Sequence, residues 1–118
     1  MSGSPVVRAL IVDDSAAFRD AAATMLAHGG ITVVGTATDG AGAVDASRAL
    51  RPDVALVDVD LGADNGFDVA EQLTDVPVIL ISTHDEQDFA DLIADSPARG
   101  FLPKFALSPE AIRGLLHG

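Results

Sequence analysis

Three short hydrophobic runs stand out from the more polar chain around them. They read VVRALIV at residues 6–12, VALV at 54–57 and VPVILI at 76–81. Each run is rich in β-branched residues and nearly continuous rather than alternating, which is typical of strands buried on both faces, as in a parallel sheet. Weaker runs at 32–35 and 100–102 predict two further strands.

Helical patterns follow each of these predicted strands. Apolar residues recur at helical spacing in five segments. They are Phe18, Ala21, Ala22, Met25 and Leu26; residues 43–50; Val69, Ala70 and Leu73; Phe89, Leu92 and Ile93; and Ile112, Leu115 and Leu116.

Capping signals predict where several of these helices begin or end. The Gly29-Gly30 pair is expected to end the first helix. Thr83 and Glu86 have the spacing of a capping box, which predicts that the fourth helix begins there. Ser108-Pro109 is expected to start the fifth helix, as an N-cap followed by proline at the first helical position.

Strand then helix, repeated five times, predicts an α/β fold. Because the crossovers are right-handed, we expect a doubly wound, five-stranded parallel sheet in a (βα)5 sandwich with five helices. The strands, numbered along the chain, are expected in the order 2-1-3-4-5. No linker or low-complexity tract interrupts the sequence, which is read as one domain over residues 1–118. Ligands of such sheets bind outside the carboxyl ends of the strands.

Polar side chains stand at those strand ends. Asp13 and Asp14 follow the first strand, Asp58 the third, Ser82 the fourth and Lys104 the fifth. In the expected strand order they converge on one crevice. Carboxylates this close would repel one another unless a cation intervenes, and hard oxygen ligands without histidine or sulfur suit Mg²⁺. Mg²⁺ often completes its shell with phosphate oxygens, so the site is predicted to hold a metal and a phosphoryl group.

Composition excludes several classes of protein. The 118 residues carry a formal net charge of -11, include no cysteine, and contain neither tryptophan nor tyrosine. Disulfides and thiolate chemistry are therefore excluded, and direct binding of nucleic acid or anionic membranes is disfavoured. The apolar runs are shorter than the roughly 20 residues of a membrane span. We expect a cytoplasmic protein.

Four motifs resemble those of the response-regulator receiver domain of two-component signalling. They read VRALIVDDS, DVALVDVDLGADNG, VILIST and GFLPK, and the similarity covers about residues 6–117. The resemblance implies a flavodoxin-like fold. It also implies that the chain accepts a phosphoryl group from a sensor histidine kinase or phosphotransfer protein, and that it is no enzyme beyond its own phosphorylation and dephosphorylation.

The resemblance assigns the phosphoacceptor and the metal ligands residue by residue. Asp58 would be the phosphoacceptor. Asp14 and Asp58 would ligate Mg²⁺ directly, Asp13 largely through a water, and Asp60 through its backbone carbonyl. The phosphoryl group adds roughly -1.5 to -2 of charge and three acceptor oxygens.

The same resemblance assigns a switch. Ser82 would hydrogen-bond the phosphoryl group, Lys104 would form a salt bridge with it, and Phe101 would turn inward as Ser82 moves. The readout would lie on the face of the fourth helix, fifth strand and fifth helix, toward an output domain or target protein. A homodimer through that face is a further expectation.

Several positions depart from the family's usual pattern. Phe105 follows Lys104 where proline is usual, which disfavours a cis bond there, and Pro103 precedes it. Gly62 stands where proline is common in the loop after the phosphoacceptor. The side chains of Asp60 and His84 lie at positions that tune dephosphorylation in the family, so an altered phosphoryl lifetime is expected.

Two alternative functions are also considered. Asp58-Val59-Asp60 resembles the D-x-D motif of haloacid-dehalogenase-type phosphatases, in which the second aspartate is a general acid–base, although this interpretation leaves Asp13 and Asp14 unexplained. The departure at Phe105 keeps open a phosphorylation-independent binding module on the same fold.

Overall fold

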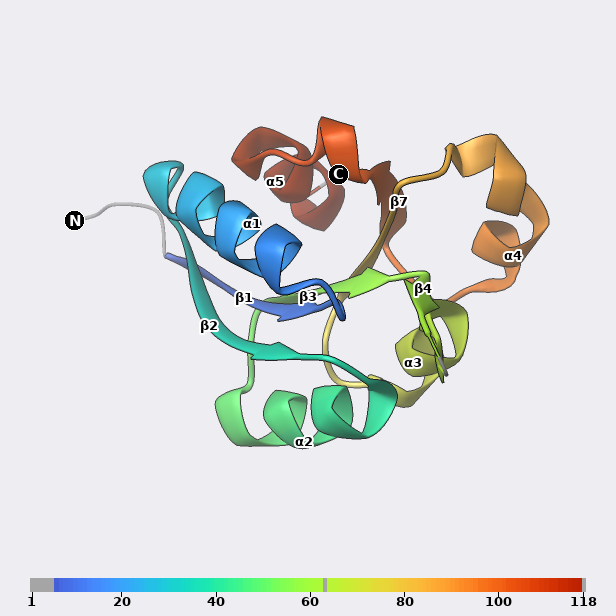
Figure 1. Cartoon of the computed structure of the whole chain (residues 1–118), viewed down its shortest axis with the longest axis horizontal. Helices are drawn as coiled ribbons and strands as arrows, with labels where there is room; N and C mark the ends of the chain where they lie inside the picture. The colour runs from blue at the N-terminus through green and yellow to red at the C-terminus, as the bar shows by residue number, and fades with distance from the viewer. Residues whose placement is uncertain (1–5, 63, 118) are drawn as a thin grey trace.

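The computed structural model describes residues 6–62 and 64–117. Most of its strands and helices alternate along the chain (Figure 1). The elements are β1 (Val7–Val12), α1 (Ala16–His28), β2 (Ile31–Ala37), α2 (Gly40–Leu50), β3 (Val54–Asp58), β4 (Asp60–Leu61), β5 (Asp64–Asn65), α3 (Gly66–Gln72), β6 (Val78–Ser82), the 3-10 helix η1 (Glu86–Phe89), α4 (Ala90–Asp95), β7 (Gly100–Pro103), the 3-10 helix η2 (Lys104–Ala106) and α5 (Pro109–His117).

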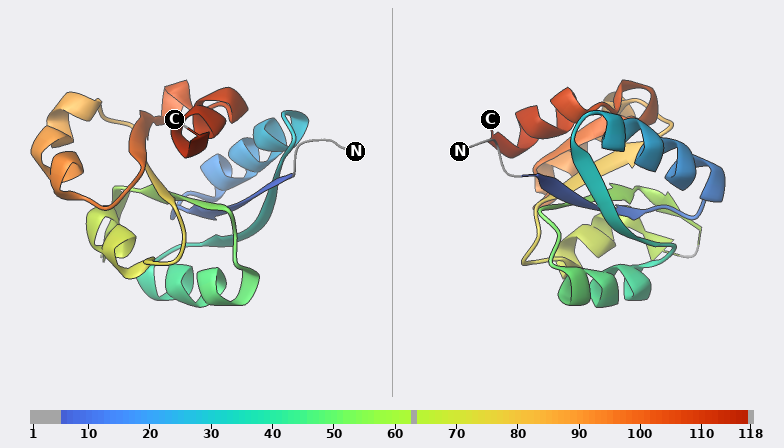
Figure 2. Two further views of the ribbon diagram at one scale, coloured as in Figure 1. Left: turned by 180° about the vertical axis from the view of Figure 1, so that it is seen from behind. Right: turned by 90° about the vertical axis from the view of Figure 1, so that its left-hand side faces the viewer.

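The central sheet confirms the predicted topology. Its five strands run in the order β2-β1-β3-β6-β7, and every neighbouring pair is parallel. This order is the predicted 2-1-3-4-5, because β4 and β5 form a separate antiparallel hairpin that the sequence did not predict. Helices α1 and α5 cover one face of the sheet, and α2, α3 and α4 lie on the other (Figure 1 and Figure 2).

Alternate residues of each central strand point into two separate cores. In β1, Leu10 and Val12 face α2 and α3, whereas Ala9 and Ile11 face α1 and α5. All four are fully buried. A strand buried on both faces has no solvent side, which explains why its sequence is apolar throughout rather than alternating.

The predicted end of α1 and the predicted start of α5 are confirmed, and α1 has in addition an N-cap that was not predicted. Ser15 Oγ accepts a hydrogen bond from the Phe18 amide at 3.2 Å at the start of α1. Gly30, just beyond that helix, has a φ of 84°, which glycine adopts without steric cost. Ser108 Oγ accepts from the Ala111 amide at 3.0 Å, and Pro109 is the first residue of α5.

The predicted capping box at Thr83 and Glu86 is wrong. The chain stays extended at Asp85, η1 begins at Glu86 without a side-chain cap, and α4 begins only at Ala90. The physical reason lies one residue before the predicted cap. Ser82 Oγ accepts a hydrogen bond from the His84 amide at 3.0 Å, and this local turn offers the backbone an alternative to a helix start at Thr83.

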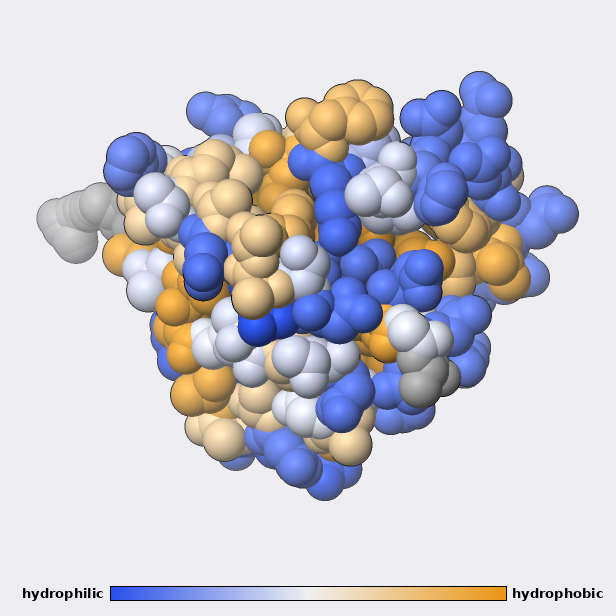
Figure 3. Space-filling model, in the orientation of Figure 1, coloured by the Kyte–Doolittle hydropathy of each residue, from blue (hydrophilic) through white to orange (hydrophobic). Residues whose placement is uncertain are grey.

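The η1–α4 segment has little packing to hold it. None of its residues is buried, and its acidic side chains form a hydrophilic region on the surface (Figure 3). Its main anchor is Phe89, whose ring centroid lies 5.9 Å from that of Phe67 and 6.1 Å from that of Phe101. One aromatic side chain thus connects this segment to α3 and to β7.

Among residues 6–62 and 64–117, the helices are all too short or too polar to cross a membrane.

Candidate functional site

The carboxyl ends of β1, β3 and β7 bring three charged side chains into contact. Asp13 follows β1, Asp58 ends β3 and Lys104 follows β7. Lys104 Nζ lies 2.6 Å from Asp13 Oδ2 and 3.1 Å from Asp58 Oδ2. Neighbouring strands are parallel and in register, with Val12 beside Val57. Residues far apart in sequence therefore meet at one edge of the sheet, as the strand pattern predicted.

Asp14 completes an acidic group at this edge. One carboxylate oxygen from each of Asp13, Asp14 and Asp58 lies within 4.8 Å of the others. Asp13 and Asp58 are buried, whereas Asp14 is exposed at the mouth of the site. Solvent therefore reaches the acidic group from the Asp14 side, whereas protein covers the carboxylates of Asp13 and Asp58.

Backbone amides fix the orientation of the two buried carboxylates. Asp13 Oδ1 accepts a hydrogen bond from the Ser15 amide at 2.8 Å, and Asp58 Oδ1 accepts one from the Asp60 amide at 3.0 Å. In each case the other oxygen, Oδ2, is left facing Lys104. The two carboxylates thus point toward the same ammonium group.

Burial and charge shift the protonation of this cluster. Burial raises the pKa of Asp58 above its usual 3.8, the Asp60 amide and Lys104 oppose that rise, and the charge of Asp13 adds to it. Burial by itself would lower the pKa of the Lys104 ammonium, but its contacts with Asp13 and Asp58 outweigh burial and raise it. The structure therefore favours a charged lysine and makes ionisation of Asp58 costly.

The acidic group fits a divalent cation. Asp13 Oδ2 is fully buried and, apart from its ion pair with Lys104, has no aligned hydrogen-bond partner in the part of the chain that the structure describes. Among the described residues, this group of three carboxylates forms ion pairs with Lys104 alone, through Asp13 and Asp58. Oxygen-only ligands of this kind suit Mg²⁺, which keeps several of its waters when bound.

Asp60 follows Asp58 closely in sequence, but its side chain is not part of this group. Its carboxylate accepts a hydrogen bond from the Gly62 amide at 3.2 Å and is exposed. Gly62 has a φ of 73° in the β4–β5 turn. The ring of proline holds φ at about -65°. Proline, which is common in the family at this position, could therefore not adopt the positive φ of this turn.

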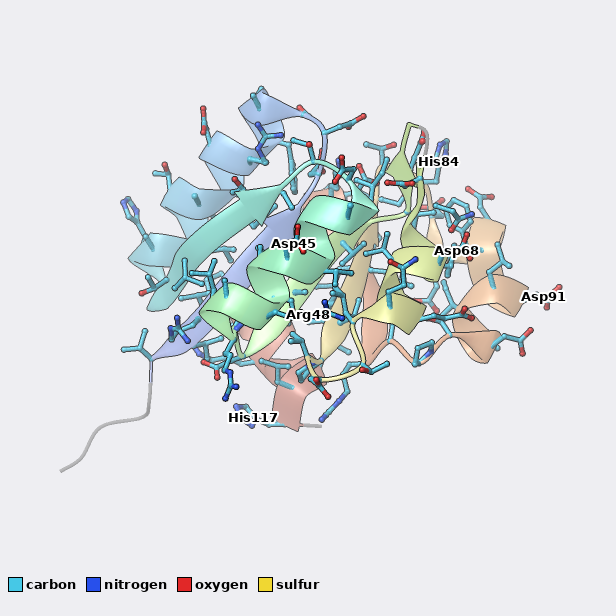
Figure 4. All side chains as sticks on the ribbon, turned by 90° about the horizontal axis from the view of Figure 1, so that it is seen from below. Asp45, Arg48, Asp68, His84, Asp91 and His117 are labelled. Atoms are coloured by element: carbon cyan, nitrogen blue, oxygen red, sulfur yellow. The ribbon has the colours of Figure 1, made fainter. Side chains whose placement is uncertain are left out.

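Ser82 and Phe101 lie on neighbouring strands next to the site. Ser82 ends β6 and is 2% exposed, and it pairs with Pro103 of β7. Phe101 is also buried, with its ring against Phe89. His84 continues from Ser82 at the end of the molecule opposite to His117 (Figure 4). Phe101 is therefore already buried before any phosphoryl group is added, and both its switch role and its movement stay predictions.

Phe105 departs from the family pattern without disturbing Lys104. Its side chain is 80% exposed, and there is no cis peptide bond at any position that the structure describes. Lys104 reaches Asp13 and Asp58 from a short 3-10 helix, η2, that follows β7 directly.

Comparison with known proteins decides the family. The family model of the response regulator receiver domain matches residues 9–116. The chain belongs to the response regulator receiver domain family. This confirms the resemblance found in the motifs, and the interpretation as a haloacid-dehalogenase-type phosphatase is left without support.

Relatives of this receiver domain come from longer proteins. It is 36% identical over 115 residues to the transcriptional regulatory protein NarL of Mycobacterium tuberculosis, covering 93% of this chain and 53% of that protein. It is 35% identical over 102 residues to the protein-glutamate methylesterase/protein-glutamine glutaminase of Haloarcula marismortui, covering 84% of this chain and 27% of that protein. The receiver thus spans about a quarter to a half of these relatives.

Solved receiver structures share the fold. The signal receiver domain of the response regulator NarL from Mycobacterium tuberculosis superimposes with a TM-score of 0.84 at 33% identity, covering 95% of this chain and 97% of that one. The response regulator domain of Thermotoga maritima CheB gives a TM-score of 0.80 at 25% identity, covering 94% of each chain.

Three residues that support the site were not singled out from the sequence. Gly66 closes the acidic motif after Asp58, and a Cβ there would overlap the Asp58 carbonyl oxygen and lie 2.7 Å from Val59 Cα. Phe18 and Arg19 lie in the first turn of α1, where apolar spacing indicated only a core helix. The Phe18 ring lies under Lys104 Nζ, and Arg19 Nη1 donates to the Asp13 carbonyl. Gly66 could have been noticed as the last residue of the motif DVALVDVDLGADNG. The contacts of Phe18 and Arg19, in contrast, cannot be predicted from a single sequence.

We expect Gly66→Ala to destabilise the receiver by about 1–3 kcal/mol, because the new methyl group must displace the backbone of Asp58 or Val59. The matched control is Gly114→Ala in α5, where an added Cβ meets nothing within 4 Å. That control should stabilise by about 0.5–1 kcal/mol. Urea unfolding measures both, and equal effects of the two substitutions would contradict the tight contact.

We expect Asp58→Asn to stabilise the receiver at neutral pH in the absence of divalent ions. Since the pKa of Asp58 is raised by folding, the folded state binds more protons than the unfolded state between pH 3.8 and that higher pKa. Wild-type stability therefore falls as pH rises through this window, and the variant escapes this loss. The excess in free energy of unfolding of Asp58→Asn over wild type should be greatest near pH 7 and shrink toward pH 4.

Urea unfolding from pH 4 to pH 7 in EDTA measures this advantage. Asp45→Asn on the exposed side of α2 is the control and should follow wild type at every pH (Figure 4). An Asp58→Asn curve parallel to wild type would contradict a raised pKa.

Proposed function

We propose that this receiver accepts a phosphoryl group on Asp58 from a phosphohistidine of a sensor kinase or phosphotransfer protein, in a Mg²⁺-dependent reaction. The observation that carries the proposal is the contact of Lys104 Nζ with both Asp13 and Asp58, beside Asp14. A nucleophilic carboxylate, an acidic metal group and a positive charge are thereby held in one place.

The transfer needs one bond to form and one to break. A carboxylate oxygen of Asp58 bonds to phosphorus as the P–N bond of the phosphohistidine breaks, and the imidazole nitrogen keeps the electron pair. The product is an acyl phosphate on Asp58. Such transfers pass through a loose transition state, so catalysis depends mostly on positioning and charge neutralisation. Lys104 supplies a positive charge from 3.1 Å away.

Asp13, Asp14 and Asp58 would hold the Mg²⁺, with the backbone carbonyl of Asp60 as a further ligand. When bound, Mg²⁺ neutralises charge on the carboxylates and on the phosphoryl oxygens. The buried Oδ2 of Asp13, which lacks an aligned hydrogen bond, supports this assignment. The receiver would act on itself alone, in gaining and losing the phosphoryl group, and would not turn over a separate substrate.

The new phosphoryl group would then pull on its neighbours. Lys104 would pair with a phosphoryl oxygen, and the Ser82 hydroxyl would turn to donate to another. Because Ser82 now accepts from the His84 amide at 3.0 Å, that movement would disturb the turn leading into η1. Phe89 connects this segment to Phe101, so the change would reach the face formed by α4, β7 and α5.

That face is where an output domain or target protein would bind, and a homodimer through it is part of the proposal. The relatives place receivers beside a regulator of transcription and beside a methylesterase, so either kind of output is compatible with the fold. With a net charge of -11, the receiver itself would not contact DNA. We propose a cytoplasmic location.

We expect acetyl phosphate with Mg²⁺ to add one phosphoryl group to wild type and none to Asp58→Asn, since asparagine offers no carboxylate nucleophile. Intact-protein mass spectrometry measures the product, and hydroxylamine should remove it because acyl phosphates are labile. Asp45→Asn on α2 is the matched control and should be labelled like wild type. Equal behaviour of wild type and Asp58→Asn would instead favour a phosphorylation-independent module.

We expect Mg²⁺ to raise the free energy of unfolding, because it would bind the folded acidic group and not the unfolded chain. A concentration ten times the dissociation constant should add about 1.4 kcal/mol. Asp14→Asn should lose most of this gain, whereas Asp45→Asn should keep it. Urea unfolding in MgCl2, against NaCl of equal ionic strength, measures the gain, and a gain of the same size in all three proteins would exclude this site.

A further inference from the structure

We propose that Phe18 is a positioning residue for Lys104, whose ammonium group its ring holds in place beside Asp13 and Asp58. The inference rests on the proposed function of Lys104 and adds a residue from a different element. Lys104 Nζ lies 4.3 Å from the centroid of the Phe18 ring, over its face. The face of an aromatic ring is negative, so it attracts a cation placed there.

The first turn of α1 holds Phe18 rigidly in this position. The Phe18 amide donates to Ser15 Oγ at 3.2 Å, and the half-buried ring packs against the core that α1 and α5 share. The next residue, Arg19, donates from Nη1 to the Asp13 carbonyl at 2.7 Å. One helical turn therefore contacts both the backbone of Asp13 and the ammonium group of Lys104.

The geometry explains why an aromatic ring matters there. Lys104 has a long, flexible side chain that remains 16% exposed, and within the described residues its ammonium group is attracted by Asp13, Asp58 and the Phe18 ring. During phosphoryl transfer the ammonium group must move from the Asp58 carboxylate toward the phosphoryl oxygens. A ring face attracts the charge without a fixed hydrogen bond, so it holds the amine in the site through that movement.

If Phe18 only filled space in the core, substitutions at this position would give a different result from the one expected for a ring that attracts Lys104. Leucine at position 18 would keep most of the apolar packing and the helix, but it has no negative face. Tyrosine would keep both the packing and the ring. Phe18→Leu and Phe18→Tyr thus separate attraction from packing. Phe105→Leu is the matched control, because it removes a ring next to Lys104 in sequence that is 80% exposed.

Lys104 is the only lysine in the chain, so protein labelled with ¹³C,¹⁵N-lysine gives signals from this residue alone. We expect a restricted Lys104 Cε in wild type, with an NOE between its protons and the Phe18 ring. Phe18→Leu should free the Cε and slow labelling by acetyl phosphate and Mg²⁺ about two- to fivefold, the range expected from such contacts. Phe18→Tyr and Phe105→Leu should behave as wild type in both measurements.

Three results would overturn the proposal. They are a wild type without the NOE, a Phe18→Leu protein whose lysine stays as restricted as in wild type, and a Phe18→Leu protein that is labelled as fast as wild type. The wild-type NOE decides the matter even if Phe18→Leu fails to fold. If Lys104 behaves as expected but no protein is labelled, wild type included, then phosphorylation of Asp58 is wrong while the placement of Lys104 by Phe18 is supported.

Discussion

The ion pair of Lys104 with Asp13 and Asp58 is the contact on which the site depends. Lys104 and Asp58 are 46 residues apart in sequence, and only a parallel sheet with β1, β3 and β7 in their observed places brings them within 3.1 Å. Burial of two neighbouring carboxylates costs free energy unless a positive charge is close. The fold thus places the Lys104 ammonium group directly beside the buried carboxylates of Asp13 and Asp58.

The best packed and least packed parts of the receiver meet at this site. The central strands are buried on both faces, whereas η1 and α4 bury no residue and carry several acidic side chains. Elements with few buried contacts open at low free-energy cost, and moving elements are drawn from them. A rigid sheet would hold the reacting groups while Phe89 connects the loosely held segment to Phe101.

Departures from the family pattern are absorbed locally. Gly62 takes a left-handed conformation in the β4–β5 turn, and Phe105 projects into solvent after Lys104. Neither change alters the contacts that Lys104 makes with the carboxylates. Gly66, in contrast, lies so close to the Asp58 backbone that no side chain fits without a shift. Whether one of these positions accepts a different side chain therefore depends on the atoms that lie around its Cβ.

The parallel strands and the two-sided core follow from the hydrophobic pattern. The strand order, and with it the grouping of Asp13, Asp14, Asp58 and Lys104, was expected together with the resemblance of the motifs to receiver domains. Continuous apolar runs reveal buried strands, and parallel strands place their carboxyl ends together. The start of α4, the β4–β5 hairpin and the ring of Phe18 over Lys104 do not follow from the sequence. Each depends on contacts between distant residues or on competition between two local structures, as between a turn at Ser82 and a helix start at Thr83. Periodicity records which face of an element is buried, but only the folded chain decides which atoms meet there.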